Sequence, residues 1–107
     1  MKAFSQYMLK QFVHQMVTHL RRDFVGAVAQ RTDEELETVV GQAIASGVKY
    51  GLELEWEVEK LLEVMISLGD DFDTKPETNW VEEILRQSDL DSAARFEMIF
   101  VRLEKDQ

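Results

Sequence analysis

The sequence predicts an all-α fold, a compact bundle of about five helices built by residues 1–107 as a single domain. Three observations support this prediction. Apolar residues recur at spacings of three and four, and no stretch has the pattern of a convincing strand. Glycines follow the ends of two periodic stretches. The length of 107 residues and the hydrophobic content of 45% suit one domain with a real core.

The first expected helix runs from about Phe4 to Phe24 and has an unusually wide apolar face. At about 100° per residue, its apolar positions cover an arc of roughly 220°, far wider than an ordinary amphipathic stripe. Such a helix is either central in its own bundle or partly covered by another chain. The apolar positions are Phe4, Met8, Leu9, Phe12, Val13, Met16, Val17, Leu20 and Phe24.

The second expected helix follows Thr32 and ends at Tyr50. Thr32 and Glu35 have the spacing of a capping box, and Gly51 suits a left-handed position after the last turn. Its inward face holds Leu36, Val39, Val40, Ala43, Ile44, Gly47 and Tyr50. The alanine and the glycine in this face are small enough to let another helix approach closely.

The third expected helix runs from about Leu54 to Leu68 and ends at Gly69. Its inward face holds Leu54, Val58, Leu61, Leu62, Met65 and Leu68. Trp56 lies about 160° from Val58 at about 100° per residue, so it points away from that face. Five acids crowd this region against a single lysine: Glu53, Glu55, Glu57, Glu59 and Glu63. They form either a solvated face or a docking face for a basic partner.

Two further helices are expected near the C-terminus. One covers about Asn79 to Gln87, with Thr78 as a candidate cap, and the other follows Asp91, which is its expected cap. The inward residues of the last helix are Phe96, Ile99, Phe100 and Leu103.

The stretch "LGDDFDTKPETNW" joins the third and fourth expected helices. Its aspartates, Asp70, Asp71 and Asp73, do not match a calcium loop, because Lys75 and Pro76 stand where an acid and a glycine are needed. The stretch is therefore interpreted as a shaped connector. In this interpretation Phe72 enters the core, Asp71 and Asp73 cap backbone N–H groups or pair with an arginine, Pro76 stiffens the chain and Trp80 anchors the next helix.

Composition and residue spacing argue against nucleic-acid-binding proteins and against most classes of enzyme. The net charge of −9 disfavours nucleic acids and anionic membranes, since both require basic surfaces. The chain has no cysteine, so disulfides and thiolate metal sites are excluded. His14 and His19 are five residues apart and diverge by about 140° on a helix, unlike the spacings of three or four used by zinc sites. No catalytic residue, cofactor or metal is expected.

A family resemblance covers most of the chain. "FVHQMVTHLRRDF" followed by "VKYGLELEWEVEKLLEVMISLGDDFDTKPETNWVEEIL" resembles small bacterial proteins encoded beside type VI secretion effectors. The matching positions are His19, Leu20, Arg21, Tyr50, Gly51, Leu52, Leu68, Gly69, Asp71, Phe72, Asp73, Pro76, Trp80, Ile84 and Leu85. The chain departs from the pattern at Val25, Asn79 and Ser92, where relatives often have proline, and at Glu53, where they have Ser or Thr.

The resemblance implies a cytoplasmic, non-enzymatic accessory factor. Such an adaptor or co-chaperone would bind an effector, its chaperone or a component of the secretion spike. The alternative is an immunity protein that neutralises a toxic effector, since acidity also suits the inhibition of a basic nuclease. No catalytic residues are carried over by the resemblance.

Trp56 is the most specific candidate for partner binding. Tryptophan is enriched at binding hot spots, and Glu59 and Glu63 would form a polar rim that steers a basic surface. The partner would be another protein or a second copy of this chain. Alternatively, Trp56 leans back over a neighbouring loop or covers the stem of Lys60.

Overall fold

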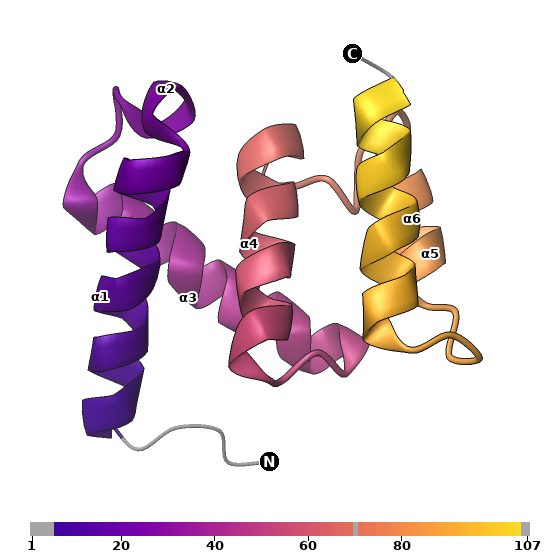
Figure 1. Cartoon of the computed structure of the whole chain (residues 1–107), viewed down its shortest axis with the longest axis horizontal. Helices are drawn as coiled ribbons and strands as arrows, with labels where there is room; N and C mark the ends of the chain where they lie inside the picture. The colour runs from indigo at the N-terminus through magenta and orange to yellow at the C-terminus, as the bar shows by residue number, and fades with distance from the viewer. Residues whose placement is uncertain (1–5, 70, 106–107) are drawn as a thin grey trace. The chain divides into compact units, whose positions relative to one another are not determined.

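The computed structural model describes residues 6–69 and 71–105, which form six helices and no strand. The all-α prediction is therefore confirmed, with six helices in this part of the chain rather than about five. The helices are α1 (Gln6–Asp23), α2 (Val25–Val28), α3 (Asp33–Tyr50), α4 (Glu55–Leu68), α5 (Trp80–Leu85) and α6 (Ser92–Lys105). The chain divides after residue 70 into two compact units, one with α1 to α4 and one with α5 and α6 (Figure 1). The single domain expected for residues 1–107 stays a prediction.

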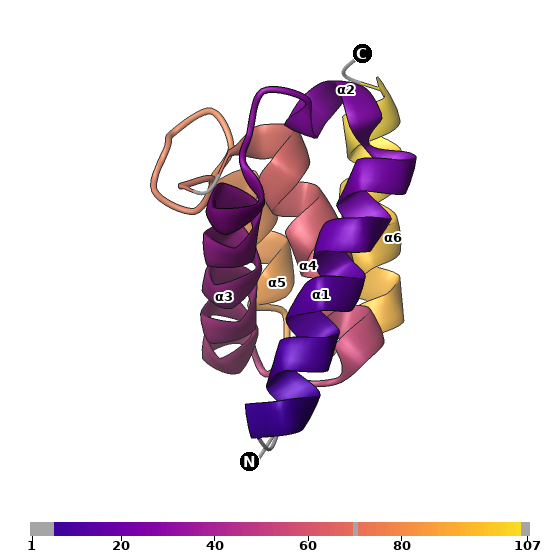
Figure 2. The same cartoon turned by 90° about the vertical axis from the view of Figure 1, so that its left-hand side faces the viewer.

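In the first unit, α3 packs against both α1 and α4. Figure 1 shows α3 passing behind these two helices, and Figure 2 shows α1 in front with α4 behind it. The buried apolar side chains of the three helices are Phe12, Met16, Val17, Leu20, Leu36, Val39, Val40, Ala43, Tyr50, Val58, Leu61, Leu62, Val64 and Met65. Most of these were expected to point inward from their spacing, and Val64 extends the buried face of α4.

The wide apolar face of α1 is only partly covered. Phe12 and Leu20 are buried, whereas Met8 and Leu9 near the start of the helix are substantially exposed. Phe4, where the helix was expected to begin, lies outside the described residues. Whether this helix is central in its own bundle or partly covered by another chain stays open.

α1 ends at Asp23, one residue earlier than expected, and the short α2 follows it. At Phe24 the backbone leaves the helical region, with φ −128° and ψ 41°. The spacing of apolar residues did not predict α2, because four residues are too few to establish a helical period.

Arg21 fixes the chain between α2 and α3. Its guanidinium donates to the carbonyl oxygens of Val28 at 2.9 Å and Arg31 at 2.7 Å. It also donates to the carboxylate of Asp33 at 2.7 Å. A planar guanidinium with several donors suits such convergent acceptors.

Both predicted caps of α3 are confirmed. The backbone N–H of Glu35 donates to the hydroxyl of Thr32 at 3.1 Å, and the backbone N–H of Thr32 donates to the Glu35 carboxylate at 2.8 Å. At the other end Gly51 is left-handed with φ 74°. The N–H of Leu52 donates to the carbonyl of Gly47 at 2.6 Å, which completes a Schellman motif.

The chain approaches Gly47 closely, as predicted, but the nearest group belongs to the turn after α3 rather than to another helix. A Cβ added to Gly47 would collide with the carbonyl oxygen of Leu52, in the turn that follows the same helix. The side chain of Val58 from α4 lies at ordinary contact distance, 3.5 Å from that position.

Two predictions for residues at the start of α4 are wrong. Leu54 was expected to point inward but is 59% exposed, because it is the extended residue that precedes the first turn. Glu57 was placed among the acids of the outer face but is only 8% exposed. Its carboxylate accepts a hydrogen bond from the backbone N–H of Leu54 at 3.0 Å, so Glu57 caps the helix.

α4 ends at Gly69, as predicted, although its backbone differs from that of Gly51. Gly69 has φ 105° and ψ 156°, and its N–H donates to the carbonyl of Met65 at 2.8 Å. Only glycine adopts this combination of angles readily. The residue therefore ends the helix.

In the second unit, residues 71–79 form a series of turns before α5. Phe72 is buried, as predicted, and its carbonyl accepts a hydrogen bond from the Thr78 hydroxyl at 2.7 Å. The prediction that Thr78 caps α5 is therefore wrong, because its side chain is committed to the connector. The packing of Phe72 and Trp80 against the first and third expected helices stays a prediction.

α5 and α6 pack against each other. Asp91 caps α6 as predicted, by accepting from the N–H of Ala94 at 2.8 Å. Arg95 donates to the carbonyl of Leu85 at 2.7 Å, which satisfies the last turn of α5. The guanidinium of Arg102 lies 4.2 Å from the centre of the Trp80 ring, in a cation–π contact.

Candidate functional site

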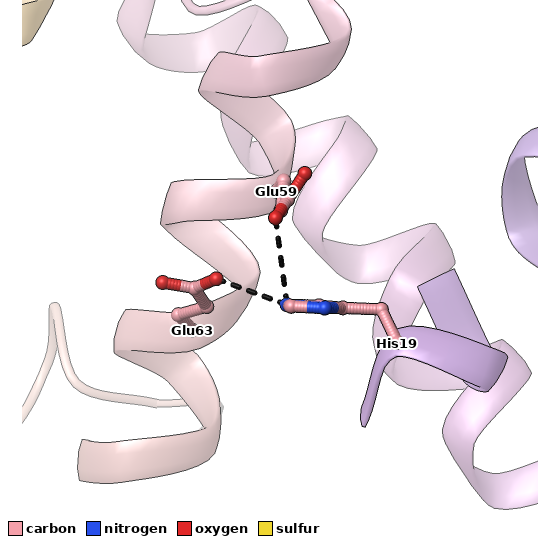
Figure 3. A group of neighbouring side chains, drawn as sticks. All are labelled: His19, Glu59 and Glu63. Atoms are coloured by element: carbon pink, nitrogen blue, oxygen red, sulfur yellow. Dashed lines mark hydrogen bonds and ion pairs between the residues drawn. The ribbon is translucent and has the colours of Figure 1, made fainter. Parts of the chain in front are cut away.

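The candidate site is a cluster of His19 from α1 with Glu59 and Glu63 from α4. The side chain of His19 points across to α4 (Figure 3). Its Nε2 lies 3.0 Å from Oε2 of Glu63 and 3.5 Å from Oε2 of Glu59. The three side chains offer ligand atoms that all lie within 4.8 Å of one another.

The packing of the helices explains why these residues meet. Leu20, beside His19, is fully buried, and so is Leu62, beside Glu63. These leucines anchor the inner faces of α1 and α4. The neighbouring polar residues are thereby held at the edge of the core, where the side chain of Glu63 is only 13% exposed.

A third carboxylate holds the other side of the imidazole ring. Nδ1 of His19 lies 3.0 Å from Oδ2 of Asp23, one helical turn away. The ring also makes an edge-on contact with Phe24, with centroids 5.7 Å apart. Neutral imidazole has one N–H and can donate on only one side, whereas imidazolium donates to Asp23 and to the glutamates together.

Two basic residues border the cluster. Arg22 donates to both carboxylate oxygens of Asp23 at 3.1 Å. This hydrogen bonding lowers the pKa of Asp23 and raises that of Arg22; the charges of Arg22 and His19 act on Asp23 in the same direction. On the other side, Nζ of Lys60 lies 3.6 Å from Oε1 of Glu63, the oxygen that is not turned toward His19.

A shallow hollow of about 400 Å³ opens beside the cluster. Its lining includes His19, Glu59 and Arg22, so water and small solutes reach the imidazole from this side. His14 lines the same hollow but is not part of the cluster.

Trp56, the predicted partner-binding residue, lies on the same stripe of α4, three residues before Glu59. It is 43% exposed, so the chain's own atoms cover the rest of its surface. Leu54 and Glu55, just before it, are both exposed. The N-cap residue Leu54 and the first turn of α4 therefore expose two large apolar side chains beside acidic groups. Glu59 and Glu63, the predicted rim, face His19 instead of standing free.

The surroundings of the signature residues of the resemblance differ along the chain. Tyr50 is buried, and Gly51 and Gly69 both have positive φ. In the connector the Asp71 carboxylate lies 3.6 Å from Nζ of Lys75, a lysine rather than the arginine allowed for. Asp73 is partly buried and Pro76 is exposed.

The histidine–carboxylate cluster does not follow from the sequence pattern. The sequence compares His19 only with His14 on the same helix, and it predicts Glu59 and Glu63 as a rim for a partner. The available signal was the spacing of Glu59 and Glu63, which places both carboxylates on one helix face. His19 lies 40 and 44 residues before these glutamates, so the spacing within one helix does not connect it to them. The expected absence of a metal is untested.

No protein-family model, curated protein or solved structure matches the chain. The resemblance to proteins encoded beside type VI secretion effectors therefore stays a prediction. None of the helices in the described residues is long and apolar enough to cross a membrane.

Proposed function

We propose that this chain is a non-enzymatic, cytoplasmic accessory factor that assists a type VI secretion effector or its chaperone by binding it directly. The resemblance in sequence supports a role in type VI secretion. The observation that carries the binding role is the exposed start of α4, where Trp56 in the first turn is 43% exposed and the N-cap residue Leu54 is 59% exposed. Exposed apolar patches and exposed tryptophans are typical of binding surfaces.

The charge of the chain favours a partner with a basic surface. The net charge is −9, and Glu55 lies between the two exposed apolar residues. Opposite charge on the partner would accelerate the encounter, and the aromatic contact would then hold the complex. The negative charges of Glu59 and Glu63 both add to this attraction. Glu59 is partly exposed, whereas Glu63 is largely buried.

Deletion of the gene in its native host tests the role. An accessory factor is required for delivery of its effector, so deletion should abolish killing of competitor cells while the host grows normally. An immunity protein behaves differently, since its loss poisons the host when the toxin is present. Self-poisoning with normal delivery would replace this proposal with the immunity role.

Complementation then tests the surface. The deletion strain should regain delivery with the wild-type gene and with Val48→Ala, which truncates an exposed apolar residue of α3. Trp56→Ala should fail to restore delivery although the protein accumulates to the normal level. Full rescue by Trp56→Ala would exclude the first turn of α4 as the binding surface.

A further inference from the structure

We infer that His19, Glu59 and Glu63 form a binding site for one divalent metal ion, with Zn²⁺ as the best fit. This goes beyond the proposed function and departs from the absence of a metal expected from sequence. The sequence does not reveal the site because one ligand comes from α1 and two come from α4.

The distances suit zinc without rearrangement of the helices. In a tetrahedral site with bonds of about 2.0–2.1 Å, neighbouring ligand atoms are about 3.3–3.4 Å apart. The Nε2 atom of His19 is 3.0 Å from the Glu63 oxygen and 3.5 Å from the Glu59 oxygen. The site therefore needs shifts of only a few tenths of an ångström at these two edges. The two glutamate oxygens lie within 4.8 Å of each other and can close further by side-chain rotation.

Asp23 orients the histidine as a metal ligand requires. Histidines that bind metals generally donate their other ring N–H to a carboxylate or a carbonyl, which fixes the tautomer. Here Nδ1 of His19 lies 3.0 Å from the Asp23 carboxylate. With the proton on Nδ1, the lone pair of Nε2 points between the two glutamates.

The charge balance also favours a cation. Glu59 and Glu63 are one turn apart on α4, and like charges at this spacing destabilise a helix. Lys60 contacts the Glu63 oxygen that faces away from His19. Arg22 is hydrogen-bonded to Asp23 and interacts with Glu59 through its charge alone. When Zn²⁺ binds, any proton on Nε2 leaves to solvent and an N–Zn bond replaces the N–H bond. The centre of the three ligands thereby gains positive charge.

The donor set selects among metals. Imidazole suits zinc and other first-row divalent ions, whereas calcium and magnesium prefer oxygen ligands alone. The hollow beside His19 and Glu59 admits water, which would complete a four-coordinate ion.

Zinc titration of the purified, untagged chain tests the site. Competition with a chromophoric chelator should show one Zn²⁺ per chain, with a dissociation constant in the micromolar range or tighter. His19→Gln and Glu63→Gln should each weaken binding at least tenfold. The matched controls His14→Gln on α1 and Glu55→Gln on α4 should leave the affinity within twofold of wild type.

Thermal melts with a chelator present establish that each variant is folded. If His19→Gln does not fold, the more exposed Glu59→Gln takes its place and should also weaken binding at least tenfold. The proposal is overturned if wild-type protein binds zinc no more tightly than millimolar, or if the controls lose as much affinity as the cluster variants. Neither result bears on the accessory role, because no partner is present.

Discussion

Gly47 and Gly41 lie in the same helix, α3, but their surroundings differ. A Cβ at Gly47 would collide with the Leu52 carbonyl, whereas a Cβ at Gly41 meets nothing within 4 Å. We expect Gly47→Ala to destabilise the fold by about 1–3 kcal/mol through overpacking. Gly41→Ala should stabilise it by about 0.5–1 kcal/mol through helix propensity. Urea unfolding measures both, and equal effects would contradict the close approach.

The buried side chain of Phe72 gives a second test. Its side chain is fully buried, so Phe72→Ala should cost about 3–5 kcal/mol, as for large aromatic residues in protein cores. Pro76→Ala, at an exposed position of the same connector, is the control and should have a much smaller effect. An unchanged melting temperature for Phe72→Ala would contradict the role of this residue in the core.

Asp23 makes the stability of the fold depend on pH. Because hydrogen bonding from Arg22 lowers its pKa in the folded state, Asp23 stabilises the fold at pH values above its unfolded pKa of about 3.9. This contribution is lost as the pH falls through the folded pKa. The melting temperature of wild type should therefore exceed that of Asp23→Asn at pH 6, and the two should converge toward pH 2. A difference that grows on acidification would contradict the sign of the shift.

At the scale of helices, the junction from α2 to α3 depends on Arg21. Arg21→Met removes charge-assisted hydrogen bonds to two carbonyls and one carboxylate, and we expect a loss of roughly 2–4 kcal/mol. Arg22→Met is the control, since the Arg22 side chain is largely exposed and bonds only to the adjacent Asp23 among the contacts described above. Chemical denaturation should show a larger loss of stability for Arg21→Met than for Arg22→Met.

Helix ends were predictable where their determinants are local. The box of Thr32 and Glu35, the Asp91 cap and the left-handed Gly51 all depend on residues within four positions of one another. Predictions failed where a side chain had a competing partner, as with Thr78, which bonds to the carbonyl of Phe72. Glu57 was misplaced for a similar reason, because an acid in a first turn can serve the backbone rather than solvent.

At the scale of the whole molecule, the fold class followed from periodicity, but the candidate site did not. Helical spacing shows which residues share a face, and it does not show which faces of different helices meet. His19, Glu59 and Glu63 therefore remained unconnected until α1 and α4 were placed around α3. The proposed partner surface is different, because the outward position of Trp56 follows from α4 alone.

The exposed start of α4 is the surface proposed to bind a protein partner. The most direct test is the affinity of Trp56→Ala for the partner that co-purifies with wild-type protein from the native host, measured beside the thermal melt of the variant. We expect a nearly unchanged melt, affinity weaker by at least about 2 kcal/mol, and association that slows as salt is added. A collapse in stability, with normal binding by the protein that remains folded, would show that Trp56 belongs to the core and would contradict the claim.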